Sequence, residues 1–148
     1  MNRLETIAPQ LVQQLRKASH AQQRAAAIAA ATFAVHRVNV RDANVADACK
    51  NLVAGRPLTA TQQSELEATC VSLDNEYVQL HTEAEQGQAT ITDYMDKFVQ
   101  ARAIAALLAA FQSDSLEASS ESIYEAAAMS DDNRSLFSIV ERVLDHKH

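Results

Sequence analysis

Residues 98–111 read FVQARAIAALLAAF, a run in which only Gln100 and Arg102 interrupt the apolar side chains. The run contains no glycine or proline, and its commonest residue, alanine, has the highest helix propensity. A helix that is apolar on nearly every side is a buried one, because it has no polar face to turn toward water. We therefore predict a helix over about residues 93–112 that lies at the centre of the fold.

The composition of the whole chain favours further helices around this segment. The 148 residues include 28 alanines but only two glycines and two prolines, too few turn-forming residues for a β-sandwich or β-barrel. A chain of this length is typical of one domain with a sizeable core. The prediction is an all-α fold, with a single domain over residues 1–148 and a compact bundle of six to seven helices around the buried Ala/Leu-rich helix.

Polar residues at helix starts place the other helices. Ser19 with Gln22, and Thr59 with Gln62, have the spacing of a capping box, in which each side chain accepts from the other residue's backbone N–H. Asp42 is a further N-cap residue. The expected helices cover about residues 9–17, 19–37, 42–53, 59–85, 93–112, 113–129 and 130–144.

Charge is distributed unevenly along the chain, whose net charge is −6. Residues 1–56 carry eight Lys and Arg against three Asp and Glu, whereas residues 57–96 carry eight acidic residues and no Lys or Arg. A general nucleic-acid binder needs a basic face that reaches phosphates, so this polarity argues against nucleic acid as a partner. One interpretation is that the basic first third packs on the acidic middle and neutralises it internally.

An acidic ridge is expected on the helix over residues 113–129. Glu117, Glu121 and Glu125 repeat at every fourth position, with Asp114 one turn earlier, and no Lys or Arg occurs in that helix to relieve their repulsion. Like charges at this spacing cost a few tenths of a kcal/mol per pair. The ridge is interpreted either as an ordinary solvated face or as a docking face for a basic protein.

The long middle helix, over about residues 59–85, combines a core stripe with acidic flanks. Val71 and Val78 project away from the stripe, among the carboxylates of Glu67, Asp74 and Glu85. Such a patch is either a second partner-binding surface or a contact with another helix of the same chain. The core stripe consists of Leu66, Cys70, Leu73, Tyr77, Leu80 and Ala84.

The sequence contains no pattern that predicts catalysis, a metal or a cofactor. Two glycines cannot build a phosphate-binding loop or a nucleophile elbow, and no Glu is followed by His three residues later. His81, Glu85 and Asp74 form the one conceivable metal cluster, which we interpret as a polar flank. Cys49 and Cys70 lie in apolar stripes and are expected to remain reduced and unreactive.

The sequence also predicts a cytoplasmic protein. Its longest apolar runs, residues 25–31 and 103–111, are far shorter than the roughly 20 residues that a membrane span requires. The first residues contain no apolar segment of the kind found in a signal peptide. A membrane partner is therefore not expected.

Tyr94 and the segment 103–108, AIAALL, lie in the part of the chain that most resembles small all-helical bacterial immunity proteins. The chain is similar to these toxin-neutralising proteins in size, acidity and helical pattern, and similar also to all-helical bacterial families of unknown function. The first resemblance implies a non-enzymatic inhibitor that occludes a basic toxin through an acidic helical face. One alternative is a homo-oligomeric scaffold paired through Val71 and Val78, and another is a bundle with a ligand pocket beside Tyr77 and His81, near Tyr94.

Overall fold

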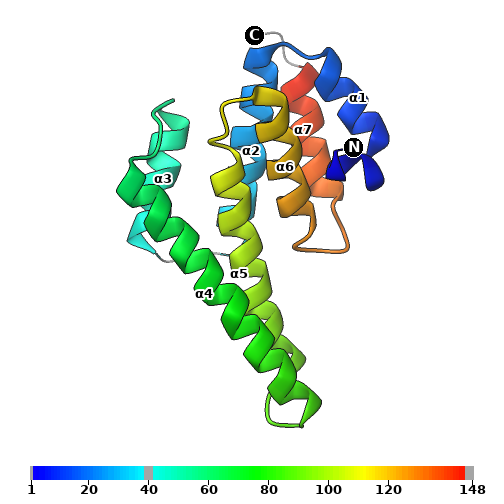
Figure 1. Cartoon of the computed structure of the whole chain (residues 1–148). Helices are drawn as coiled ribbons and strands as arrows, with labels where there is room; N and C mark the ends of the chain where they lie inside the picture. The colour runs from blue at the N-terminus through cyan, green and yellow to red at the C-terminus, as the bar shows by residue number, and fades with distance from the viewer. Residues whose placement is uncertain (1, 39–41, 146–148) are drawn as a thin grey trace.

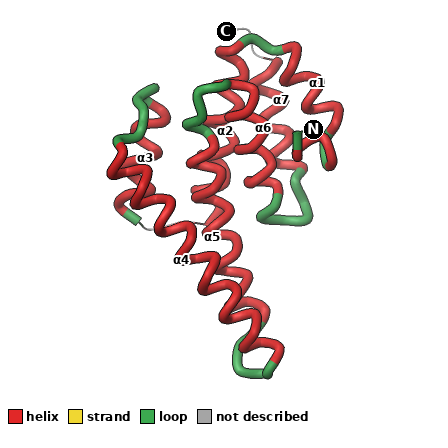
Figure 2. Tube along the Cα trace, viewed as in Figure 1, coloured by secondary structure: helices red, strands yellow, loops and turns green. Residues whose placement is uncertain are grey.

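The computed structural model describes residues 2–38 and 42–145, and within these ranges the chain is all-α, as predicted. Figures 1 and 2 show helices joined by short loops, with no strand in the described residues. In the described ranges, a 3-10 helix, η1 (Arg3–Thr6), precedes seven α-helices. These are α1 (Pro9–Lys17), α2 (His20–Val38), α3 (Ala43–Val53), α4 (Ala60–Glu85), α5 (Ile91–Ala109), α6 (Ser115–Ala127) and α7 (Arg134–Asp145).

The expected capping interactions start the helices. Thr59 and Gln62 form a capping box at α4, and the backbone N–H of Ser19 donates to Gln22 Oε1 at 3.0 Å at the start of α2. Thr90 caps α5 through a further box with Asp93, so this helix begins at Ile91, two residues before the predicted start. Because these contacts join residues only three apart, the local sequence is sufficient to place them.

The helices form a packed bundle from which one hairpin projects (Figure 1). In the bundle, α2 packs on α5, α6 and α7, and α5 also packs on α6. The alanines of α2 allow this close approach on two sides, since Ala26 and Ala30 belong to one core cluster while Ala27 and Ala31 belong to another. The α4–α5 hairpin extends away from the bundle, with its connecting turn at the far end of the molecule.

The central helix is buried over its second half. Ala103, Ile104 and Leu107 are fully buried, whereas Ile91, at the first residue of α5, is 68% exposed. The first half of α5 lies in the projecting hairpin beside α4, and for this reason only one side of it is covered. Within the described residues, no helix has the length and apolar character needed to cross a membrane.

Helix α6 is more deeply buried than its serines and glutamates suggest. Ser119, Ser120 and Ser122 are fully buried. The Ser122 hydroxyl donates to the carbonyl oxygen of Ala106 on α5 at 2.9 Å, and it also lies 3.3 Å from the carbonyl oxygen of Ala27 on α2. These small side chains let three helices approach one another, and the acidic residues of α6 emerge at the edge of that contact.

Candidate functional site

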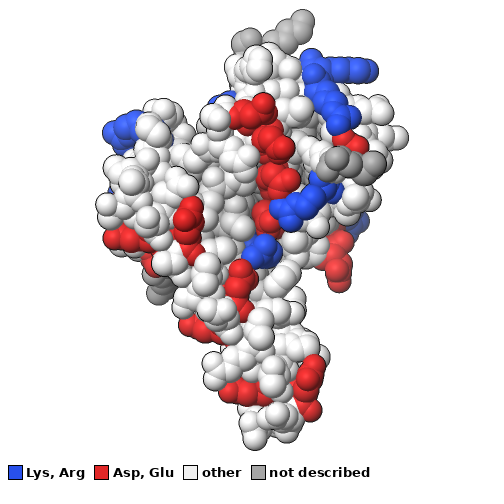
Figure 3. Space-filling model, viewed as in Figure 1, with Lys and Arg blue, Asp and Glu red and all other residues white. Residues whose placement is uncertain are grey.

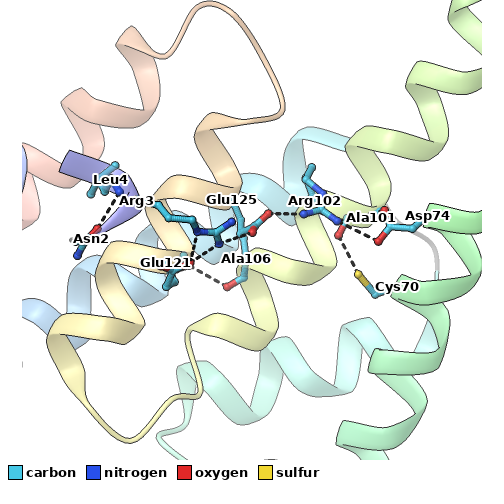
Figure 4. A network of polar contacts seen from close by, with 11 residues as sticks. Asn2, Arg3, Leu4, Cys70, Asp74, Ala101, Arg102, Ala106, Glu121 and Glu125 are labelled. Carbon is cyan, nitrogen blue, oxygen red and sulfur yellow. Dashed lines mark hydrogen bonds and ion pairs between the residues drawn. The ribbon is translucent and has the colours of Figure 1, made fainter. Parts of the chain in front are cut away.

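A chain of charged side chains crosses four elements of the fold (Figure 4). Arg3 of η1 contacts Glu121 and Glu125 of α6, with Nη2 donating to Glu125 Oε1 at 2.9 Å. Arg102 of α5 donates from Nη1 to Glu125 Oε2 at 2.8 Å and from Nη2 to both carboxylate oxygens of Asp74 on α4 at 3.2 Å. We call these five residues the charge network.

The network corrects the interpretation of the α6 ridge. The expectation that no cation relieves Glu121 and Glu125 is wrong, because Arg3 and Arg102 approach them from distant parts of the sequence. Glu125 is only 6% exposed and each of its two oxygens accepts from an arginine. Glu125 therefore binds the two arginines at the inner edge of the site, and its carboxylate is not available to a partner's cation.

The basic first third of the chain does not neutralise the acidic middle in the way considered above. Among the described residues, Arg3 and Arg16 pair with acids of α6 and η1. The paired acids of α4 instead take partners from the hairpin itself, such as Lys97 for Glu76, at 3.3 Å. The reason is geometric, since α4 packs chiefly on α5 while η1 packs on α1 and α6.

The two arginines of the network remain charged. Burial alone would lower the pKa of Arg102, but the charges of Glu125 and Asp74 outweigh it and raise this pKa above its ordinary value. The pKa of Arg3 is also raised, chiefly by its side-chain hydrogen bond to Glu121, against a smaller effect of burial. The network is thus a chain of ion pairs that links η1, α6, α5 and α4.

A groove of about 360 Å³ lies beside the network, between α4 and α6, and we call it the acidic groove. Ala105, Leu108 and Ala109 of α5 supply apolar lining, while Glu67 lines it from α4 and Glu121 from α6. Figure 3 shows the acidic side chains of α6 as a column, with further acidic side chains over α4 across an uncharged surface. The remaining lining residues are Arg3, Gln63, Cys70, Gln112 and Glu125.

The first turn of α6 extends the acidic wall of this groove. Asp114 is the N-cap of α6 and accepts from the backbone N–H of Glu117 at 2.9 Å. The side chain of Glu117 is exposed, as is that of Glu67, and neither has a cationic partner within the described residues. These are the carboxylates that remain available to an external cation.

Three residues of the predicted surface lie elsewhere. Val78 is 61% exposed and Val71 is 59% exposed on the outer face of α4, where Val71 lines a separate hollow of about 600 Å³. Glu85 is the last residue of α4, at the hairpin end, and its Oε1 lies 3.4 Å from His81 Nδ1. The structure therefore joins Asp74 to the acids of α6 through Arg102, but it does not bring Val78 or Glu85 into the acidic groove.

Both cysteines have raised pKa values, and Cys70 lines the acidic groove. Burial raises the pKa of the Cys70 thiol, with a further contribution from Asp74, and its Sγ lies 3.4 Å from the carbonyl oxygen of Ala101. Burial also raises the pKa of Cys49. A thiol with a raised pKa is a poor nucleophile at neutral pH. No group of three potential metal ligands occurs among the residues that the structure describes.

The rings of Tyr77, His81, Tyr94 and Phe98 form a cluster between the two helices of the hairpin. The ring centroid of Tyr77 is 5.9 Å from those of His81 and Tyr94 and 5.4 Å from that of Phe98, and the His81 and Tyr94 rings are 4.9 Å apart. At these separations the rings are in direct contact. The ligand pocket proposed beside these rings stays a prediction.

Sequence reasoning missed Arg3 and Arg102 as members of the site, and it grouped Glu67 with Val71 and Val78 rather than opposite α6. Arg102 carried a usable signal, because a lone arginine within a nearly all-apolar helix needs carboxylate partners when the helix is buried. Arg3 carried none, since 118 residues separate it from Glu121.

No family model matches the chain, and no curated protein or solved structure matches it either.

Proposed function

We propose that this protein is a cytoplasmic protein-binding inhibitor that takes a basic segment of its partner into the acidic groove. The observation that carries the proposal is an apolar floor on α5 between carboxylates of α4 and α6. In the specific form suggested by its resemblance to immunity proteins, the partner is a basic toxin whose active cleft is occluded.

The groove offers the two features that an amphipathic basic helix needs, an apolar strip and acidic side chains beside it. Leu108 and the neighbouring alanines offer an apolar strip to the partner's apolar side chains. For the partner's Lys and Arg, Glu67 lines the α4 wall, and Glu117 lies one helical turn before Glu121 of the α6 wall. Helix-in-groove recognition combines apolar anchors with charges at the rim in this way. The rim charges set orientation and association rate more than affinity.

Internal pairing limits how much negative charge faces the partner. Arg3 and Arg102 compensate part of the charge of Glu121, Glu125 and Asp74. The unpaired carboxylates of Glu67 and Glu117 are therefore the residues expected to control association.

The test begins with capture of partners from the native host at low salt, after which a stoichiometric basic partner is purified. Its association rate is then measured against the unmodified protein, the double variant Glu67→Lys/Glu117→Lys, and a control, Glu141→Lys, on the exposed side of α7. Because the double variant loses electrostatic steering, its association rate is expected to fall by about tenfold or more and to depend less on salt concentration. Equal rates for the double variant and the control contradict the proposal.

Exposure of Val71 and Val78, one heptad apart on α4, favours a second candidate. In this alternative, the outer face of α4 pairs with α4 of another copy and the protein is a homo-oligomeric scaffold. Sedimentation equilibrium distinguishes the two, because a mass that rises with concentration and falls in Val71→Asp supports the scaffold. A monomer mass at all concentrations removes this alternative.

A further inference from the structure

A second groove, of about 740 Å³, lies between α2 and α7. Its apolar lining includes Ala29 and Phe33 of α2 and Ile139 of α7, and Thr32 and Ser135 complete its middle. None of these residues belongs to the acidic groove. The volume is in the range of roughly 300–1,000 Å³ that is usual for small-molecule sites.

The groove exists because short side chains occur where the two helices meet. Ala29, Thr32 and Ser135 are too small to fill the space between α2 and α7, although the helices pack against each other. Phe33 and Ile139 are half-buried, so each presents part of its apolar surface to the groove. An apolar body can gain contact with both without displacing any core side chain.

One end of the groove is polar and includes the guanidinium of Arg37. Arg37 lies in the last turn of α2, with its guanidinium carbon 5.7 Å from the centroid of the Phe33 ring, and it forms no ion pair with another described residue. His36 lies beside it in the sequence and also lines the groove.

The acid at this end is already engaged. Asp132 accepts from Arg134 Nε at 3.0 Å and from Arg134 Nη2 at 2.8 Å, and also from the backbone N–H of Arg134 at 3.1 Å. Both carboxylate oxygens thus have a donor from Arg134. The pKa of Asp132 is lowered chiefly by its hydrogen bonds to Arg134, and the charge of Arg37 contributes as well. Two arginines thus face one acid here, so this end of the groove is positive although the whole chain carries a net charge of −6.

We propose that the α2–α7 groove binds a small amphipathic carboxylate, with its apolar body against Phe33 and Ile139 and its carboxylate paired with Arg37. A guanidinium binds a carboxylate with two parallel hydrogen bonds, which gives the site a preference for this head group over an alcohol or an amine. The proposal is independent of the acidic groove, because the two sites share no lining residue.

The test uses decanoate, below its micelle concentration, with decanol and decylamine of equal chain length as comparisons. Titration calorimetry on the full chain is expected to show saturable 1:1 binding of decanoate and weaker binding of the other two. Arg37→Gln is expected to weaken decanoate binding by about tenfold, the loss of one charge-assisted pair, and to leave decanol unaffected. Arg142→Gln, an exposed arginine of α7 outside the groove, is the matched control and should bind decanoate normally.

A second variant tests the apolar part of the site. Ala29→Phe places a ring in the hollow and should abolish binding of decanoate and decanol alike, while circular dichroism reports whether the helices are retained. The proposal is overturned if decanoate does not bind, if decylamine binds equally well, or if Arg37→Gln and Arg142→Gln bind decanoate with the same affinity.

Discussion

Replacement of Glu125 by alanine tests the charge network, because this residue joins its two arginines. The carboxylate accepts from Arg3 at 2.9 Å and from Arg102 at 2.8 Å, and its side chain is 8% exposed. Glu125→Ala removes both contacts and leaves Arg102 with Asp74 alone, at 3.2 Å. The guanidinium of Arg102 cannot recover water freely, since its side chain is only 21% exposed.

The magnitude follows from these contacts. Breaking a buried pair by removing one partner costs about 3–5 kcal/mol, and a hydrogen bond to a charged group contributes about 1.5–3 kcal/mol. Because Arg102 keeps Asp74 and Arg3 is half-exposed, the lower end applies. We expect Glu125→Ala to lower the free energy of unfolding by about 3 kcal/mol.

The assay is urea unfolding followed by circular dichroism, with Glu141→Ala as an exposed control that should change stability by no more than about 0.5 kcal/mol. The double variant Arg102→Ala/Glu125→Ala should cost less than the sum of its single variants by about 1 kcal/mol or more, because the two residues are in contact. A loss below about 0.5 kcal/mol for Glu125→Ala, or strict additivity in the cycle, would show that the network does not stabilise the fold.

Two further predictions concern the core and the thiols. Leu107→Ala should lower the free energy of unfolding by about 2–5 kcal/mol in the same urea assay, because Leu107 is fully buried in the second half of α5. The exposed control Val71→Ala should change it by no more than about 0.5 kcal/mol. Equal losses for the two variants would contradict the assigned burial. Cys49 and Cys70 should react with a disulfide reagent more slowly than a free thiol at pH 8, and the rate should keep rising above that pH, because their raised pKa values reduce the thiolate fraction at a given pH. Stopped-flow absorbance measures the rate. A rate at pH 7 equal to that of a free thiol would contradict this prediction.

Local patterns made the helices predictable. Thr59 with Gln62 and Ser19 with Gln22 act across three residues, so the chain itself holds both partners close together. The sequence did not predict how burial changes along α5. Met95 is 37% exposed and Leu107 is fully buried, although both lie in one continuous helix. Whether neighbouring helices cover a given turn depends on where those helices end.

The candidate site was predictable only in part, for the same reason. Asp114 and Glu117 lie on one face of α6 because of helical periodicity, and the sequence showed this directly. Glu67, on the opposite wall of the acidic groove, belongs to a different helix. Its position relative to α6 depends on how α4 and α6 both pack around α5.

The sequence by itself determined that the protein is helical, where most of its helices begin, and that α6 carries a row of carboxylates. The exception is α7, which begins at Arg134 rather than near residue 130. Only the tertiary structure decided that Arg3 and Arg102 neutralise part of that row, and that Val78 lies away from it. The physical reason is one of range. Helix periodicity and capping act over three or four residues, whereas ion pairs form between any side chains that packing brings within about 4 Å, whatever their separation in the chain.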